Sequence, residues 1–406
     1  MVENTKVMTL SKFRIVIPKD ATVNESTFAY ALRYHLKKVY QCSLDVVSDS
    51  DTVTENEILV GGTSCTADKA ENFGFAVSAR GGKLHLVATD MRGYQAMYSY
   101  VVNTLFADTE SSIEDGFEYT AKAPSELNDG TVFATESYGD MRIMFYNIYG
   151  GRSQSGGQAV RFPLQREIVA TYAPTVLGLQ ETTQGYHEGF TPMLEELGYT
   201  TIDGYDDGIN HTLLYYKADR VTLLDSGFLL YSGANNANSK SLTWGVFEDR
   251  ATTKKFAVIN THFMWSDPAL AEGEANRTRV SNARELIGVK NAILEKYPNI
   301  PVIMGGDLNC KVHEEPHGIL KNGGMVSVWE KATVKNDSGG RKGYSTYDAE
   351  EKTFTASPKV WGFYTDSIDH AYATPNTNVK TYCSLADLYC QWTSDHMPVV
   401  VEFDLN

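Results

Sequence analysis

Apolar residues in the second part of the chain fall into short runs that alternate with stretches of helical spacing. The runs, such as TVLGLQE and PVIMGGDLN, are rich in Val, Ile, Leu and Met, which is typical of buried strands. Pro163–Pro174 and Arg277–Tyr297 have the spacing of amphipathic helices and precede those two runs. Strands accompanied by helices on the outside predict a layered α/β architecture.

The first part of the chain predicts a small α+β unit, in which no acids, histidines or thiols cluster. Either Asn24 or Ser26 could serve as the N-cap of its first helix. Alternating runs on both sides of Arg-Gly-Gly-Lys predict a hairpin. Strands are expected over 13–18 and 57–62, the hairpin turn over 80–83, and helices over 29–40 and 93–106.

Between the two parts, the stretch 120–140 loses periodicity and collects Pro, Ser, Asn, Asp and Gly, which is typical of a linker. We therefore predict an accessory domain over 1–125, a linker over 126–140 and a second domain over 141–406. NEILVGGT and GFAVSARGGKLHLVATDMRGYQAMYSYV resemble parts of the small α+β domain that precedes the barrel in several carbohydrate-active enzymes. That resemblance implies either a packing role or contact with a glycan.

Each strand-like run of the second part adjoins a side chain that can bind a divalent metal ion or a phosphate. A charged group beside an apolar strand has to be paired, bound to a metal or exposed, because burying it alone is costly. We expect these side chains to gather where the strands end. They are Asn147, Glu181, His262, Asp307, Asn309, Asp369, Asp395 and His396.

Two segments carry the sharpest signals. In GGDLN, Asp307 and Asn309 have period-two spacing, so an extended chain would point both side chains to one side, where they could hold a water molecule. An Asx turn is the alternative. In SDHMP, Asp395 and His396 are adjacent and need different partners; Asp395 suits a metal ion, and His396 suits a carboxylate such as Asp369 in SIDH.

Taken in order, NIYGG, GLQE, NTH, GGDLN, SIDH and SDHMP resemble the endonuclease/exonuclease/phosphatase superfamily, whose fold is also that of DNase I, over about 141–406. The resemblance implies a four-layer α/β/β/α sandwich, two β-sheets with outer helices, and a phosphoester hydrolase with its site at one edge of the sheets. The residues matched to metal binding are Asn147, Glu181 and Asp395. Those matched to catalysis are His262, Asp307, Asn309, Asp369 and His396. Arg152 and His211 are candidate substrate contacts.

The net charge of the chain and the type of candidate ligand limit the classes of cofactor and substrate that we expect. Oxygen ligands select hard cations, so Mg²⁺ or Mn²⁺ is expected. The formal charge of −15 and the pI near 5.1 disfavour long nucleic acid, since proteins that grip a phosphate backbone usually carry a basic stripe. We expect a small substrate, such as a sugar phosphate or a phospholipid headgroup. A metal-dependent nuclease and a non-catalytic protein that binds a phosphorylated ligand or a glycan are the rival classes.

The sequence says less about the cellular location and the oligomeric state than about the substrate and the cofactor. No run reaches the roughly 18–20 apolar residues of a membrane helix, and MVENTKVMTL lacks the pattern of a signal peptide. A soluble protein is expected, either cytoplasmic or secreted with a signal peptide absent from this chain. Five cysteines without a CxxC motif argue against a disulfide framework or a zinc site. The sequence leaves the oligomeric state open.

Overall fold

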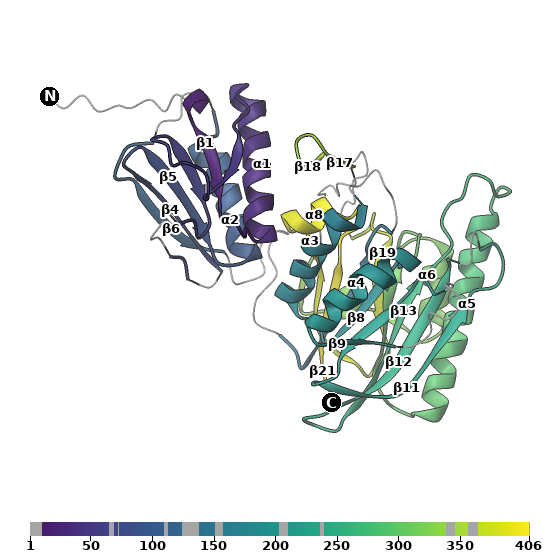
Figure 1. Cartoon of the computed structure of the whole chain (residues 1–406). Helices are drawn as coiled ribbons and strands as arrows, with labels where there is room; N and C mark the ends of the chain where they lie inside the picture. The colour runs from purple at the N-terminus through teal and green to yellow at the C-terminus, as the bar shows by residue number, and fades with distance from the viewer. Residues whose placement is uncertain are drawn as a thin grey trace. The chain divides into compact units, whose positions relative to one another are not determined.

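The computed structural model of the chain divides into two units, each with its own hydrophobic core (Figure 1). Unit 1 comprises Met1–Pro124 with Tyr347–Thr355, and unit 2 comprises Ser125–Thr346 with Ala356–Asn406. The structure describes residues 10–64, 69–71, 73–108, 113–123, 138–150, 157–202, 210–235, 239–337, 346–355 and 364–405. Arg152, one of the two predicted substrate contacts, lies outside the described residues.

Unit 1 is a six-stranded mixed sheet with helices packed on it (Figure 1). In sheet order, its strands are β2 (Val46–Ser48), β1 (Arg14–Ile17), β3 (Glu57–Val60), β5 (Lys83–Ala88), β4 (Gly74–Arg80) and β6 (Glu118–Lys122). Its helices are η1 (Leu10–Lys12), α1 (Val23–Tyr40), α2 (Met91–Tyr100) and the π-helix η2 (Val101–Leu105). Phe28, Leu32 and Met97 of α1 and α2 are buried in the core of the unit.

Helix α1 begins with a capping box. The Oγ1 of Thr22 accepts a hydrogen bond from the backbone N–H of Glu25 at 3.2 Å, and Glu25 Oε2 accepts one from the N–H of Thr22 at 2.7 Å. Glu25 Oε1 also accepts from the N–H of Gly62 at 3.1 Å, which joins the helix to the chain after β3. The prediction of Asn24 or Ser26 as the cap is wrong, because the Thr-x-x-Glu signature at 22–25 starts the helix earlier.

A hairpin of β17 (Thr346–Asp348) and β18 (Thr353–Thr355) packs in unit 1, although the chain before and after it is in unit 2. Glu351 forms an ion pair with Arg33 of α1 at 3.1 Å and another with Lys37. Phe354 is only 7% exposed. The predicted division into consecutive domains placed this hairpin in the second domain, whereas it belongs to unit 1 in the structure. A pairing between residues more than 300 positions apart leaves no periodic trace in a sequence.

Unit 2 contains two mixed sheets. In sheet order, the seven-stranded sheet is β16 (Val334–Asn336), β20 (Asn378–Ser384), β21 (Val399–Asp404), β7 (Met141–Asn147), β8 (Val176–Gln180), β10 (Leu214–Lys217) and β9 (Tyr199–Thr201). The six-stranded sheet is β11 (Val221–Leu230), β12 (Ser241–Asp249), β13 (Lys255–His262), β14 (Val302–Asp307), β19 (Asp369–Ala373) and β15 (Val326–Ser327).

Helices cover the outer faces of both sheets (Figure 1). Those on the seven-stranded sheet are α3 (Gly157–Tyr172), α4 (Gln184–Glu196) and α8 (Leu388–Thr393). Those on the six-stranded sheet are α5 (Glu274–Lys296) and α6 (Glu315–Asn322), whereas the short α7 (Val328–Lys331) contacts β20 of the seven-stranded sheet as well as β15 and β19. The predicted four-layer sandwich is therefore confirmed. Among the described residues, no helix combines the length and apolar character needed to cross a bilayer.

The apolar layer between the two sheets holds unit 2 together. Phe145 and Phe403 come from the seven-stranded sheet, and Phe247 and Phe256 from the six-stranded one. Burying a large apolar side chain stabilises a fold by roughly 1.5–3 kcal/mol. At Gly305 a Cβ would lie 2.4 Å from the ring of Phe145, so the glycine makes room for close packing of the sheets.

The strand registers bring the predicted polar residues to one edge of the sheets. His262 lies opposite Asp307 in the parallel pair β13 and β14, and Asp307 lies opposite Asp369 in the antiparallel pair β14 and β19. Asp369 thus begins its strand, and the SDHMP segment precedes β21. These segments do not end strands as predicted. The start of an antiparallel strand nevertheless lies beside the end of its neighbour, so the expected gathering still occurs.

We predict that Glu351→Gln loosens the hairpin, because Arg33 and Lys37 then lose the carboxylate that pairs with both. Hydrogen exchange over residues 346–355 should become faster, with β14 unchanged. The control is Glu350→Gln, which removes the same charge from an exposed neighbour. Equal exchange of the hairpin in both variants would mean that the ion pairs do not hold it.

Candidate active site

Asp307, at the end of β14, is the centre of the polar cluster. Its Oδ2 accepts a hydrogen bond from Asn147 Nδ2 at 3.1 Å and lies 3.3 Å from Nε2 of His262. Its Oδ1 accepts a hydrogen bond from the backbone N–H of Asn309 at 2.8 Å. The residue is 2% exposed, so the N–H donors of Asn147 and Asn309 take the place of water around a buried carboxylate.

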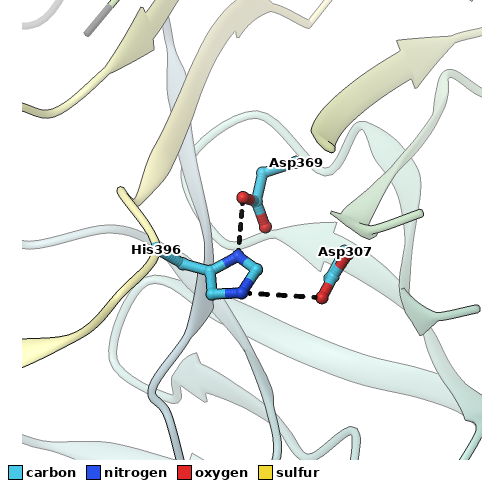
Figure 2. A group of neighbouring side chains, drawn as sticks. All are labelled: Asp307, Asp369 and His396. Carbon is cyan, nitrogen blue, oxygen red and sulfur yellow. Dashed lines mark hydrogen bonds and ion pairs between the residues drawn. The ribbon is translucent and has the colours of Figure 1, made fainter. Parts of the chain in front are cut away.

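His396 lies between Asp369 and Asp307 (Figure 2). Its Nδ1 is 2.8 Å from Asp369 Oδ2, and its Nε2 is 3.9 Å from Asp307 Oδ2. Ser394 Oγ accepts from the N–H of His396 at 3.0 Å and donates to the carbonyl oxygen of Asn147 at 2.7 Å. The structure thus brings together the histidine and carboxylate of SDHMP and SIDH, and Asp369 orients the ring.

Glu181 follows β8 and faces the loop after β7. Its Oε1 accepts from Asn147 Nδ2 and its Oε2 from the N–H of Gly150, both at 3.2 Å. A Cβ at Gly150 would lie 1.8 Å from the carbonyl oxygen of Glu181, so only glycine fits this approach. Asn147 Oδ1 accepts from the N–H of Tyr149 at 3.0 Å, which turns the amide nitrogen toward the carboxylates. In this orientation Asn147 donates to Glu181 and helps to position it, and its assignment to the metal site stays a prediction.

Three non-glycine residues at the site have left-handed backbone. Tyr149, Glu181 and Asn309 have φ values of 55°, 62° and 51°. Such conformations cost of order 1–3 kcal/mol each and persist where the surrounding structure enforces them. The chain after Asp307 is therefore an Asx turn, and the predicted extended arrangement is wrong. The Nδ2 of Asn309 donates instead to the carbonyl oxygen of Phe263 at 3.0 Å.

Buried side chains of α3 hold the loop after β7 in place. Arg161 Nη1 donates to the carbonyl oxygens of Ile148 at 2.9 Å and Tyr149 at 2.6 Å. Gln165 Nε2 donates to the carbonyl oxygens of Ile148 at 3.1 Å and Thr393 at 3.2 Å. These bonds join the loop to the end of α8, so the site residues on both segments are positioned by a rigid element.

Burial and neighbouring charges shift the pKa values of the cluster. Burial acts to raise the pKa of Asp307, but the positive charges of His262 and His396 outweigh it and hold that pKa well below its usual range. Burial raises the pKa of Asp369, despite the opposing charge of His396. For His396, burial acts to lower the pKa, but the charges of Asp369 and Asp395 outweigh it and raise the pKa above its usual range.

Two sets of side chains could hold a metal ion. One ligand atom each from Asp307, Asp369 and His396 lie within 4.8 Å of one another. In that set, Nδ1 of His396 already contacts Asp369, so the ring offers only Nε2. The second set, Glu181 with Asp395, is the one predicted from the sequence, and it offers carboxylate oxygens only, which are the ligands that Mg²⁺ and Mn²⁺ prefer. Asp395 is 1% exposed, and its Oδ1 lies 3.8 Å from Nε2 of His396.

Two further residues border the cluster. The predicted substrate contact His211 is half-buried, and its carbonyl oxygen accepts from the N–H of Thr182 at 3.2 Å, directly after Glu181. Lys240, which sequence reasoning missed, is 5% exposed with its Nζ 2.7 Å from Nε2 of His262. The available signal was a single lysine immediately before the strand-like run SLTWGVF in an otherwise uncharged stretch.

The model of the Endonuclease/Exonuclease/phosphatase family matches residues 144–396, which is more than half of the chain. The chain belongs to this family, and unit 2 is accordingly a hydrolase of phosphoester bonds. None of the curated proteins compared with the chain matches it.

Solved structures share the fold of unit 2. The mannosyl-6-phosphatase of Bacteroides thetaiotaomicron VPI-5482 is 23% identical, with a TM-score of 0.52, and the match covers 65% of this chain and 99% of that one. A family protein from Bacteroides thetaiotaomicron is 22% identical, with a TM-score of 0.51 and coverage of 65% and 97%. One from Bacteroides vulgatus is 21% identical, with a TM-score of 0.52 and coverage of 66% and 99%.

We predict that Gly150→Ala lowers kcat/KM for a chromogenic phosphoester by about 10²-fold, because the new Cβ displaces the loop that contacts Glu181. The melting temperature should also fall, because the new Cβ collides with a backbone oxygen, so activities are compared at a temperature at which both proteins are folded. Gly288→Ala in α5 is the control, because a Cβ there meets nothing within 4 Å. Unchanged activity of Gly150→Ala would show that the site tolerates a shift of this loop.

Proposed function

We propose that unit 2 is a phosphoesterase, dependent on Mg²⁺ or Mn²⁺, that hydrolyses a small phosphorylated substrate by in-line attack of water. The observation that carries the proposal is a cluster of four carboxylates and two imidazoles at one edge of the sheets. Its members are Glu181, Asp307, Asp369, Asp395, His262 and His396. So many acidic groups in one poorly hydrated region call for a hard cation.

Glu181 and Asp395 would hold that cation through their carboxylate oxygens, and Asn147 would keep Glu181 in place. The donor set fits, because oxygen ligands suit a cation that shares itself with a substrate phosphate. When bound, the cation would act as a Lewis acid that neutralises charge on the phosphoryl oxygens.

The remaining side chains of the cluster would bind and move protons. Asp307 would accept the proton of the attacking water, with Asn309 beside it to orient the water. His262 would donate to a phosphoryl oxygen as negative charge develops. His396 would present Nε2 to the reacting group, because Asp369 occupies its Nδ1. No covalent intermediate is needed, since positioning and electrostatic stabilisation are the main requirements of phosphoryl transfer.

We favour a sugar phosphate as the substrate, with a phospholipid headgroup second. The formal charge of −15 counts against long nucleic acid. The structure of similar fold described as a mannosyl-6-phosphatase supports the choice of a sugar phosphate. A screen of sugar phosphates, inositol phosphates, sphingomyelin and DNA with Mg²⁺ and with Mn²⁺ tests the proposal. Efficient cleavage of DNA alone, with steep salt dependence, would replace it with a nuclease function.

Removing the proposed metal ligand should abolish most activity. Glu181→Gln keeps the size of the side chain but removes its charge, so we expect kcat to fall by about 10²-fold or more and the Mg²⁺ requirement to rise. The exposed Glu188 of α4 provides the control, and Glu188→Gln should behave like the wild type. Wild-type turnover that survives EDTA, or a fully active Glu181→Gln protein at limiting Mg²⁺, would contradict a metal role for Glu181.

His396 and Asp369 should act as a unit. We expect His396→Ala and Asp369→Asn each to lower kcat/KM by about 10²-fold or more, and the double variant to be scarcely worse than His396→Ala. His262→Ala should combine nearly additively with Asp369→Asn, because no contact joins them in the described residues. Full additivity between His396→Ala and Asp369→Asn, measured at saturating Mg²⁺, would show that their 2.8 Å contact is not used in catalysis.

A further inference from the structure

The packing and the ion pairs of unit 2 do not explain why the ammonium group of Lys240 is buried. Its Nζ lies 2.7 Å from Nε2 and 3.4 Å from Nδ1 of His262. Within the described residues, the Nζ of Lys240 forms no ion pair with a carboxylate, and the ring of His262 is the only partner of that atom. An ammonium group has three donor hydrogens, and an imidazole nitrogen can accept one of them at most. A buried cation with so few acceptors points to an anionic ligand.

The backbone holds Lys240 in this position. Its N–H donates to Asn235 Oδ1 at 2.9 Å, and its carbonyl oxygen accepts from Asn235 Nδ2 at 2.8 Å. The same carbonyl accepts from the N–H of Tyr231 at 3.0 Å. The next residue, Ser241, lies opposite His262 in the register of β12 and β13. The ammonium is therefore placed beside His262 by the sheet and a clamped loop, which is how a substrate contact is preorganised.

The carboxylates of Glu181 and Asp307 lie close enough to Lys240 to interact with it electrostatically. Burial lowers the pKa of Lys240, and these two carboxylates only partly oppose that shift. These carboxylates belong to the site where the phosphoryl group would bind, so Lys240 lies within reach of the same group. Lysine serves as a compact point charge for phosphate, in contrast to the planar arginine side chain.

We propose that Lys240, together with His262, binds an anionic oxygen of the phosphoryl group and makes the site selective for phosphate monoesters over diesters. The inference rests on the proposed phosphoesterase function. A monoester carries a charge of about −1.5 to −2 at pH 7, because its second pKa is near 6. A diester carries one negative charge, since its second acidic oxygen is esterified. An added cation beside the phosphoryl oxygens therefore stabilises a monoester more than a diester.

Lys240→Met, which keeps the length of the side chain and removes the charge, tests the proposal. The substrates are p-nitrophenyl phosphate and methyl p-nitrophenyl phosphate, which share a leaving group. We expect kcat/KM to fall by about 10²-fold for the monoester and by less than about 10-fold for the diester. Lys240→Arg should recover part of the monoester activity. Lys255→Met, which changes an exposed lysine at the start of β13, should leave both rates unchanged.

Equal losses with both esters would overturn the proposal, because they would indicate a structural or general role for Lys240. Circular dichroism checks the fold, and Lys240→Gln replaces Lys240→Met if the latter unfolds. If the wild type hydrolyses neither ester with Mg²⁺ or Mn²⁺, the proposed phosphoesterase function fails for these substrates. In that case, calorimetry with inorganic phosphate tests whether Lys240 contacts the phosphoryl group. Phosphate binding that is at least about 10-fold weaker in Lys240→Met supports this contact, and equal binding refutes it.

Discussion

Repulsion between carboxylates in one buried region is the constraint on which the site depends. Asp307, Asp369 and Asp395 are all at least 94% buried, where like charges repel more strongly than in water. Asp307 stays charged because the charges of His262 and His396 hold its pKa down, and Asn147 also donates a hydrogen bond to it; Asp369 has His396 beside it. These donors have to be in place before any ligand binds. Holding these donors in place requires a rigid backbone. The residues with left-handed backbone and the buried hydrogen bonds of α3 around the site provide that rigidity, at some expense in conformational strain.

The site exists only while the two sheets of unit 2 are packed together. Asn147 comes from the seven-stranded sheet, and Asp307 from the six-stranded one. Directly beneath them, Gln180 Nε2 donates to Asn260 Oδ1 across the sheets at 2.6 Å. A Cβ at Gly178 would lie 2.7 Å from the carboxamide of Asn260, so the link also requires a glycine. Small changes in the packing between the sheets will consequently alter distances among the polar groups at the edge.

The sequence was sufficient for the layered fold and for the residues that gather, because apolar runs mark buried strands and their polar neighbours mark one edge. The sequence was insufficient to predict how the polar side chains of the site are oriented. The carboxamide of Asn147 is turned by the N–H of Tyr149, and Asn309 is redirected by a left-handed turn. Lys240 becomes notable only once the strand register places it beside His262. The catalytic parts assigned to these side chains stay predictions.

The hairpin of unit 1 also has a consequence for synthesis of the protein. Glu351 completes the ion pairs of Arg33, yet roughly 220 residues separate the end of the first segment of unit 1 from the hairpin. At roughly 5–20 residues per second, a ribosome takes roughly 10–45 s to make that stretch. During this interval the face of α1 that receives the hairpin is uncovered. The amino-terminal unit thus begins folding first but is finished only after most of its neighbour has been translated.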